Sequence, residues 1–436
     1  MNHPCPQPRM LASVVVLASV LVIGTAGAVE RISVATGGGQ GNGQSRFAAI
    51  SGTGRYVVFT SEANNLVGGD SNASADVFLR DRVLGTTTRI SNNADGSQSN
   101  AASGEANISF DGSRIVFPSF AKLVPGAGYL NCYLHNRGTG TMQVLDLLPT
   151  GQPASTCTSA SIDAAGERVA LVSADPLEAG DLERYDVYVR DLVAGTMRRV
   201  SRTTSGGFTN GANTDARISG DGSRVIFFSA ATNLVAGDSN GFADVFLAST
   251  DNSVPIQRVN VGPGNTQASA PAVGVYVAAT NADGSLLAFS SDSISLPNWG
   301  QFAEETLYLR IPSLDQTIAM SLPGGNLPRE GFNYEPDFDY SGRWLVFAST
   351  DQLYAGAENG GVYVIDVVEG LIQQISIGGN TGNVHTPRLS ADGTGIVWYS
   401  NSGTQVPGDT NGTWDVFYAD NPLWVETAIF TDGFDG

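Results

Sequence analysis

Residues 109–119, SFDGSRIVFPS, decide the fold, because close copies of this stretch occur at six other places in the chain. The copies are SGTGRYVVFTS (51–61), DAAGERVALVS (163–173), SGDGSRVIFFS (219–229), NADGSLLAFSS (281–291), DYSGRWLVFAS (339–349) and SADGTGIVWYS (390–400). Their turn glycines follow one another at intervals of 51 to 62 residues: Gly54, Gly112, Gly166, Gly222, Gly284, Gly342 and Gly393. A unit of this length suits one four-stranded β-sheet, which needs neighbours to cover both of its faces. The repeat predicts a seven-bladed β-propeller.

Each unit carries further strand signals after this core. One is DVFLRD (76–81), repeated as DVYVRD (186–191), DVFLAS (244–249) and DVFYAD (415–420), and the next is TTTRIS (86–91) or IQQISI (372–377). With the segment before each glycine they make four short strands, punctuated by Gly, Asp and Asn. No segment beyond the N-terminus has a convincing 3.6-residue period, so we expect an all-β protein of four-stranded antiparallel blades.

The core S-x-D-G-[SR]-x-[IVL]-x-[FW]-x-S followed by a D-[VL]-[FY] strand resembles the TolB-like, WD-like propeller repeat. The resemblance covers nearly all of residues 30 to 428. It implies a propeller fold and a compartment outside the cytoplasm. TolB itself has six blades behind an N-terminal α/β domain, whereas this chain has seven repeats and lacks that domain, so the resemblance does not identify a partner.

Residues 1–28 have the features of a secretory signal peptide. Arg9 precedes the apolar run MLASVVVLASVLVIG, and Ala26 and Ala28 occupy the −3 and −1 positions of a cleavage site. No other stretch reaches the roughly 20 apolar residues of a transmembrane helix. We expect cleavage after Ala28 and export of a soluble monomer, without a transmembrane segment, to the periplasm or the medium.

The charge of the chain excludes some partners. Without Arg9 there are 22 Lys and Arg residues against 42 Asp and Glu residues. Such a surface repels nucleic acid and anionic lipid. It can attract cations or basic partners, or it can simply keep an exported protein in solution.

Two segments could complete the last blade beside DVFYAD. ERISVA (30–35) has the pattern of a fourth strand but precedes the first blade, so it could cover the exposed edge of the last sheet. ETAIF (426–430) could take the same place. We favour the N-terminal segment, which makes residues 29–428 one propeller domain and leaves 429–436 as a C-terminal tail.

The loops divide between two faces, because strand direction alternates within a blade. The first-to-second and third-to-fourth turns are short and share one face, here called the short-turn face. The other loops often run to about a dozen residues or more and share the long-loop face, which makes that face the place for a binding surface. Residues seven and eight positions before each turn glycine enter the innermost strand there and should ring the channel mouth, although strand ends are also polar simply because they are wet. The candidate ligand-binding residues are Arg46, Glu105, Asp215, Tyr276, Tyr334, Glu335 and His385.

Three of the second-to-third loops share an Asp-x-Asn pattern that resembles the opening of a calcium loop. Alternate oxygen-bearing side chains can converge on a hard cation, but the loops lack the bidentate Glu of an EF-hand. The competing interpretation is that Asp and Asn form side-chain-to-backbone turns. The candidate calcium ligands are Asp70, Asn72, Asp76, Asp238, Asn240, Asp244, Asp409, Asn411 and Asp415.

Signals for catalysis are weak. Residues 237–241, GDSNG, match the G-x-S-x-G pattern, but Ala73 and Thr410 break it in the equivalent loops. Only His135 and His385 remain after cleavage, which excludes a multi-histidine zinc site and a well-supported triad. We therefore predict no catalytic residues and no required cofactor.

Cys132 and Cys157 are the only cysteines left after cleavage. In an oxidising compartment we expect a disulfide between them that joins neighbouring blades, with two buried free thiols as the alternative.

These features favour an exported, non-enzymatic binding or scaffold module that recognises a protein, peptide or glycan at the channel mouth. The alternative is a secreted polysaccharide-cleaving lyase or glycosidase that uses Glu105, Asp215 and Glu335. A carboxylate pair about 5 to 10 Å apart would favour the enzyme.

Overall fold

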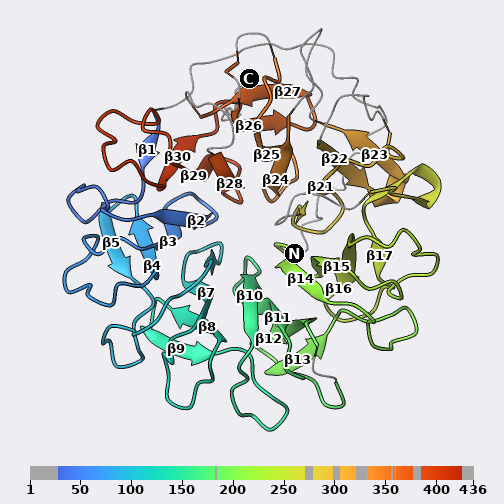
Figure 1. Cartoon of the computed structure of the whole chain (residues 1–436), viewed down its shortest axis with the longest axis horizontal. Helices are drawn as coiled ribbons and strands as arrows, with labels where there is room; N and C mark the ends of the chain where they lie inside the picture. The colour runs from blue at the N-terminus through green and yellow to red at the C-terminus, as the bar shows by residue number, and fades with distance from the viewer. Residues whose placement is uncertain are drawn as a thin grey trace, which may run out of the picture.

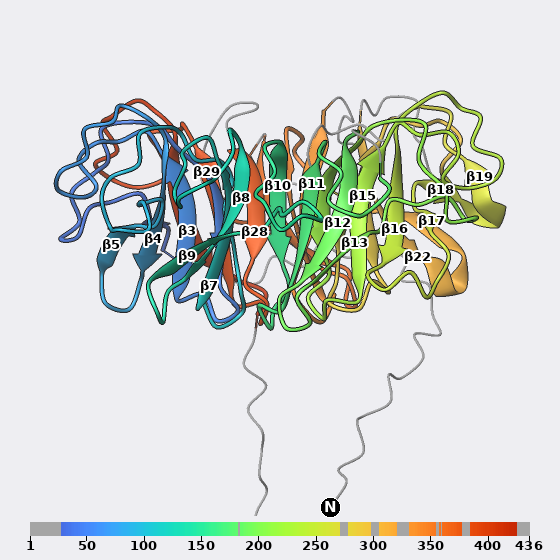
Figure 2. The same ribbon diagram turned by 90° about the horizontal axis from the view of Figure 1, so that it is seen from below.

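The computed structural model describes residues 28–181, 184–270, 278–297, 305–320, 331–354, 357–358, 360–376 and 384–424. Within these ranges the chain forms seven four-stranded antiparallel sheets around a central axis, which confirms the predicted propeller (Figure 1). We number these sheets as blades 1 to 7 in chain order. Edge-on, the ring is a flat disc whose thickness is spanned by innermost strands such as β10 and β28 (Figure 2).

Within each blade the strands follow one another from the channel outward. Blade 1 holds β2 (Ser45–Ile50), β3 (Tyr56–Ser61), β4 (Asp76–Asp81) and β5 (Thr86–Arg89); blade 2 holds β6 (Asn107–Ile108), β7 (Arg114–Ser119), β8 (Asn131–Asn136) and β9 (Thr141–Val144); blade 3 holds β10 (Cys157–Ile162), β11 (Arg168–Ser173), β12 (Asp186–Asp191) and β13 (Thr196–Arg199). Blade 4 holds β14 (Asn213–Ile218), β15 (Arg224–Ser229), β16 (Asp244–Ser249) and β17 (Gln257–Arg258); blade 5 holds β20 (Ala279–Thr280), β21 (Leu287–Ser291), β22 (Thr306–Ile311) and β23 (Gln316–Ala319). Blade 6 holds β24 (Asn333–Phe338), β25 (Trp344–Ser349), β26 (Gly361–Asp366) and β27 (Leu371–Gln374), and blade 7 holds β28 (Val384–Leu389), β29 (Gly395–Ser400), β30 (Asp415–Asp420) and β1 (Glu30–Arg31). A small hairpin of β18 (Val261–Gly262) and β19 (Thr266–Gln267) lies between blades 4 and 5.

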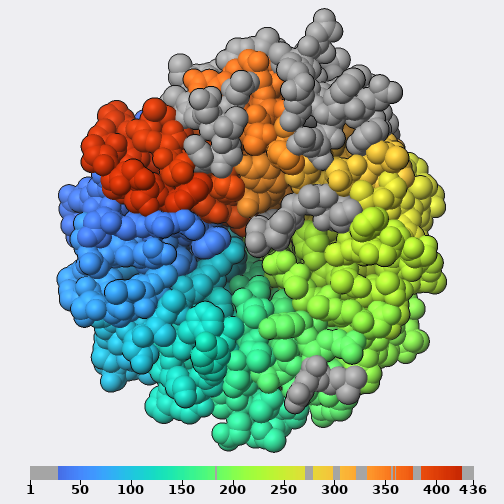
Figure 3. Space-filling model, in the orientation of Figure 1, coloured from blue at the N-terminus to red at the C-terminus, as the bar shows by residue number. Residues whose placement is uncertain are grey.

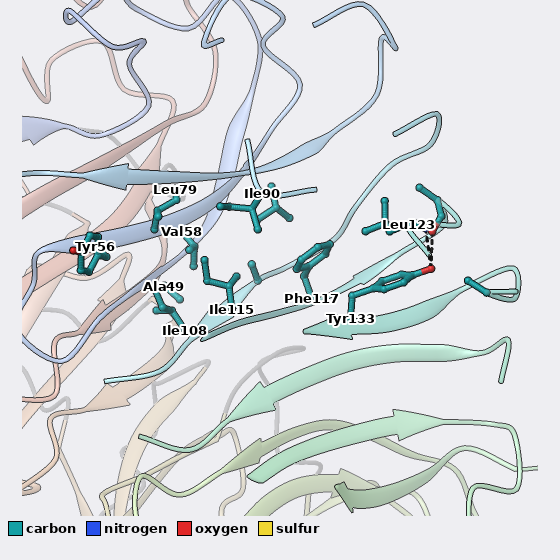
Figure 4. Close-up of a cluster of buried hydrophobic side chains, with 14 residues drawn as sticks. Ala49, Tyr56, Val58, Leu79, Ile90, Ile108, Ile115, Phe117, Leu123 and Tyr133 are labelled. Atoms are coloured by element: carbon teal, nitrogen blue, oxygen red, sulfur yellow. Dashed lines mark hydrogen bonds between the residues drawn. The ribbon is translucent and has the colours of Figure 1, made fainter. Parts of the chain in front are cut away.

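The hydrophobic core lies between the blades. Every residue of β3 is buried, and so is every residue of β25 and β29, because each sheet is covered on both faces by its neighbours. Between blades 1 and 2, Val58 and Leu79 pack against Ile115 and Phe117 (Figure 4). This two-sided burial explains why the second strands are continuous apolar runs instead of alternating ones.

The N-terminal segment closes the ring, as predicted. Glu30 lies opposite Tyr418 and Arg31 opposite Phe417 in an antiparallel pair, and the Ile32 N–H donates to the Val416 carbonyl at 2.7 Å (Figure 1). The edge of β30 is thereby paired, which removes an edge that could recruit another chain. The competing segment, 426–430, lies outside the described residues.

A belt of backbone hydrogen bonds joins all seven blades at the short-turn face. Each bond crosses one blade boundary, with N···O distances of 2.8 to 3.2 Å. The pairs, donor first, are Gly52–Phe110, Phe110–Ala164, Ala164–Gly220, Asp221–Ala282, Ala282–Tyr340, Tyr340–Ala391 and Asp392–Gly52. The belt fixes the innermost strands relative to one another, and so it sets the diameter of the channel.

The predicted disulfide between Cys132 and Cys157 is present, with a Cα–Cα distance of 5.5 Å. It joins β8 of blade 2 to β10 of blade 3, and both cysteines are fully buried. No helix within the described ranges is long and apolar enough to cross a membrane.

Candidate functional site

A β-bulge interrupts the innermost strand of several blades just below the channel mouth. The pairing register shifts after Arg46 in β2, Thr214 in β14, Tyr334 in β24 and His385 in β28. The following residue has a positive φ in each case, from 43° to 56°: Phe47, Asp215, Glu335 and Thr386. Such backbone is uncommon outside glycine, and bulges change the direction in which nearby side chains point. The bulge therefore decides which positions of the strand face the channel.

Five aromatic rings meet at the mouth between blades 6, 7 and 1, and we call them the mouth cluster: Phe47, Tyr334, His385, Tyr399 and Trp414. The His385 ring lies at its centre, with centroids 5.7 Å from Tyr334, 5.4 Å from Tyr399 and 5.4 Å from Trp414. Phe47 contacts Tyr399 at 5.7 Å. The side chain of His385 is 31% exposed, so solvent reaches the cluster.

Charged groups border the mouth cluster on two sides. The Arg46 guanidinium lies over the Trp414 ring, 5.3 Å from its centroid. Glu335 Oε2 accepts a hydrogen bond from the Thr386 N–H at 2.5 Å and lies 3.7 Å from Nδ1 of His385. Burial raises the pKa of Tyr399 to about 12, which keeps its hydroxyl neutral. The mouth thus combines apolar ring faces with one cationic and one anionic group.

A second acidic group stands beside Glu335. Glu305, just before β22, is buried, and its Oε1 has no hydrogen-bond partner within the described part of the chain. Burial, aided by the charges of Asp292 and Glu335, raises the pKa of Glu305 to about 8. The Glu305 carboxyl is therefore protonated at neutral pH.

Below the mouth, a cavity of about 130 Å³ lies on the channel axis. Among the residues lining it is a ring at the position five before each turn glycine, composed of Ala49, Asn107, Ser161, Arg217, Ala279, Asp337 and Arg388. Glu105 Oε1 lies 3.5 Å from Nη2 of Arg217 and 3.7 Å from Nη2 of Arg388. Desolvation, with a contribution from Arg388, lowers the pKa of Arg217 to about 10. Figure 3 shows the hollow at the centre of the ring.

An aromatic pair narrows the other end of the channel. Phe110 of blade 2 and Tyr340 of blade 6 meet with ring centroids 6.4 Å apart, although the two blades are not neighbours. A Cβ atom on Gly52 or Gly220 would come within 2.2 or 2.4 Å of these rings, so both glycines give the rings room. The two rings therefore occupy part of the channel at the short-turn face.

The structure divides the residues predicted to line the mouth into two levels. Arg46, Tyr334, Glu335 and His385 come together at the mouth. Glu105 and Asp215 lie near Arg217 at the deeper level. Tyr276 lies outside the described residues. The sequence analysis did not identify six of the site residues: Phe47, Tyr399, Trp414, Glu305, Arg217 and Arg388. The regular spacing of the repeat could have identified Arg217 and Arg388. No local sequence pattern distinguishes Trp414 or Glu305.

The loops predicted to bind calcium hold an arginine. Asp238 and Asp244 both lie 3.2 Å from Nη1 of Arg258, which projects from the fourth strand of the same blade. The same arrangement joins Asp70 and Asp76 to Arg89, and Asp409 and Asp415 to Arg31. Asn72, Asn240 and Asn411 each donate to the second Asp of their loop. No group of three or more His, Cys, Asp or Glu side chains in the described ranges is arranged to hold a metal ion.

No protein-family model matches the sequence, and no curated protein sequence does. Among solved structures, an oligogalacturonate lyase in complex with manganese superposes with a TM-score of 0.52 at 14% identity, covering 92% of this chain and 94% of that chain. The β-propeller domain of the trilobed protease from Pyrococcus furiosus superposes with a TM-score of 0.51 at 11% identity, covering 89% and 98%. TolB from Acinetobacter baumannii superposes poorly, with a TM-score of 0.39 at 13% identity, covering 87% of this chain and 79% of that chain. Identities this low show the propeller fold alone.

Proposed function

We propose that this protein is an exported binding module whose ligand, a protein, peptide or glycan, binds at the channel mouth on the long-loop face. The convergence of five aromatic rings with Arg46 and Glu335 supports this proposal. Aromatic faces offer apolar contact area, and a small number of charged groups can fix the orientation of a ligand. The backbone of Glu335 and Thr386 has a positive φ beside these groups, a conformation that is often found at binding sites.

Two further observations support export. The disulfide between blades 2 and 3 is of a kind that forms and persists in oxidising compartments. The segment 1–28 has the pattern of a signal peptide, and cleavage after Ala28 would leave the new N-terminus next to β1.

The mouth can be tested with a triple variant, Arg46→Ala, Tyr334→Ala and His385→Ala. Purified protein would be immobilised and used to capture partners from envelope fractions and culture supernatant, with quantification by mass spectrometry. We expect the triple variant to lose the partners that the wild type enriches. The control is Val83→Ser with Leu84→Ser, which changes two exposed residues of a third-to-fourth turn on the short-turn face. Normal capture by the triple variant together with loss in the control would place the site on the opposite face.

A second candidate function is cleavage of a polysaccharide, and one observation favours it. The Glu305 carboxyl is buried and its Oε1 has no hydrogen-bond partner among the described residues, and burial together with the charges of Asp292 and Glu335 raises its pKa to about 8. Glycosidases use a protonated acid next to a second carboxylate in this way. The test is incubation with acidic and neutral polysaccharides, followed by assays for reducing ends and for unsaturated products. Cleavage that is lost in both Glu305→Gln and Glu335→Gln would support an enzyme, and no cleavage of any substrate would oppose it.

A further inference from the structure

Arg388 carries a buried guanidinium group that lines the channel and is incompletely hydrogen-bonded. Its side chain is 6% exposed and lines the central cavity, yet its Nη2 atom has no hydrogen-bond partner in the described part of the structure. The Nη1 atom donates to the carbonyl of Pro387 at 3.0 Å. A buried donor without an acceptor is costly, so it marks a place where an acceptor can be supplied from outside.

The hydrogen bonds by which the ring joins neighbouring blades do not explain why two of its members are arginines. Three other members of the ring accept a hydrogen bond from a backbone N–H of the next blade: Asn107 from Ile162, Ser161 from Ile218, and Asp337 from Leu389, at 3.3, 3.3 and 2.9 Å. A guanidinium has no acceptor atom, so Arg217 and Arg388 cannot join blades in this manner. They place two positive charges in the channel and form no such hydrogen bond between blades.

Glu105 stands between the two guanidinium groups but is weakly held. Its distances of 3.5 and 3.7 Å are too long for good hydrogen bonds, and its side chain is 50% exposed. Solvent therefore reaches this level of the channel. The other two carboxylates that act on Arg217, those of Asp337 and Asp215, belong to the wall, where Asp337 is tied to the Leu389 N–H. Of the three carboxylates, Glu105 is therefore the one that an incoming anion can displace from the two guanidinium groups.

The cavity next to the guanidinium pair is small, and its wall is mixed: Asn107, Ser161, Thr280 and Asp337 line it together with the two arginines and several aliphatic side chains. Ile50, Ile108, Ile162, Ile218 and Leu389 contribute to its wall. Its volume of about 130 Å³ equals that of roughly four water molecules at about 30 Å³ each. These five aliphatic side chains offer apolar contact to a methyl or isopropyl group.

We infer that the channel binds the free C-terminal carboxylate of a peptide, which displaces Glu105 from between Arg217 and Arg388. The last side chain of the peptide, of the size of alanine or valine, packs against the aliphatic side chains of the cavity, and the preceding residues pass the mouth cluster. Bidentate contact with arginine suits a carboxylate and supplies the acceptor that Nη2 of Arg388 lacks. This inference rests on the proposed function, because the peptide enters through the mouth.

The test uses pools of N-acetylated tetrapeptides with three randomised residues and a final alanine or valine, made both as free acids and as C-terminal amides. Retention on the immobilised protein is measured by mass spectrometry. We expect the wild type to retain the acids at least tenfold better than the amides. Arg388→Met should reduce the acids to the level of the amides, and Glu105→Gln should raise retention of the acids at least threefold without affecting the amides.

Three controls keep the outcome interpretable. Glu335→Gln makes the same chemical change at the mouth and should affect acids and amides alike. Arg217→Met serves as the second arginine variant if Arg388→Met has an altered melting temperature. Trigalacturonate tests the other common source of a carboxylate, and its retention through Arg388 in preference to the peptide acids would overturn the assignment to peptides.

Equal retention of acids and amides, no gain in Glu105→Gln, or no retention of either pool would also overturn the inference. Its failure is distinct from failure of the proposed function. If the Arg46, Tyr334 and His385 triple variant loses captured partners while the channel variants keep them, the mouth is the binding site and the channel is not part of it.

Discussion

Glu305 shows how burial and neighbouring acids together can set the charge of a single residue. The unfolded chain would titrate this carboxyl near 4.5, whereas burial and two neighbouring acids raise its pKa to about 8 in the folded state. Between these values the folded protein holds a proton that the unfolded chain releases. This contribution to stability is complete below about pH 4.5 and is lost as the pH rises toward 8.

We therefore predict that Glu305→Gln removes part of the pH dependence of stability. The wild type should lose free energy of unfolding relative to the variant as the pH rises from 5 to 8, by at most about 1.4 kcal/mol per pH unit for one proton. Urea unfolding at several pH values measures the difference. Glu62→Gln, at an exposed position, should keep the wild-type dependence. Parallel curves for the wild type and Glu305→Gln would contradict the assigned pKa.

At the scale of elements, the recurring unit is a strand-end loop tied to the fourth strand of its own blade. In blade 4, Arg258 is 4% exposed and lies between Asp238 and Asp244, which are equally buried. The guanidinium supplies a positive charge between the carboxylates that the Asp-x-Asn pattern could have offered to a calcium ion. It also ties the long loop to the outer edge of the sheet, which holds the long-loop face in place above the channel.

Arg258→Met should destabilise the protein by about 3 to 5 kcal/mol, because it leaves two buried carboxylates without a counter-charge. Arg198→Met, on the exposed side of β13, should have little effect. Because the arginine holds the carboxylates, we also expect the wild-type melting temperature to be the same in chelator and in millimolar calcium. A drop on chelation would show that these loops bind calcium after all.

At the scale of the whole molecule, three devices hold the ring closed. The belt of backbone hydrogen bonds joins the innermost strands, β1 pairs with β30, and the disulfide joins blades 2 and 3. The first two close the ring through the backbone. The disulfide is local, and its two cysteines are separated by 25 residues.

Replacing both cysteines by alanine should lower the free energy of unfolding by about 3.5 kcal/mol, the loop-closure value for about 25 residues. Chemical unfolding under non-reducing conditions measures this. Dithiothreitol should bring the wild type down to the stability of the variant and leave the variant unchanged. Equal stability of the two proteins without reductant would mean that the bond contributes nothing.

Processing after Ala28 is a prediction about the whole chain as well. Cleavage there leaves Val29 at the new N-terminus, so that β1 begins at the second residue and can still pair with β30. Intact-mass measurement of exported protein should give a chain that starts at Val29. Retention of residues 1–28 in a membrane fraction would make them an anchor.

The repeat determined the number of blades, the all-β class and the position of every turn glycine, because stacked sheets impose the same spacing and the same buried strands on each copy. The cysteine count determined the disulfide, and the unmatched segment at 30–35 pointed to ring closure. These features depend on spacing along the chain, so they can be predicted from the sequence.

Only the tertiary structure decided the site. A bulge follows Arg46, Tyr334 and His385 at the mouth. A second ring of side chains, which includes Arg217, Asp337 and Arg388, lies deeper in the channel, at the position five before each turn glycine. Trp414 joins His385 through a loop, and Arg388 meets Glu105 from a blade two places away around the ring. These contacts depend on the closure of the ring, which brings side chains from distant repeats to one axis. The spacing of residues along the chain does not indicate which of those side chains will be in contact.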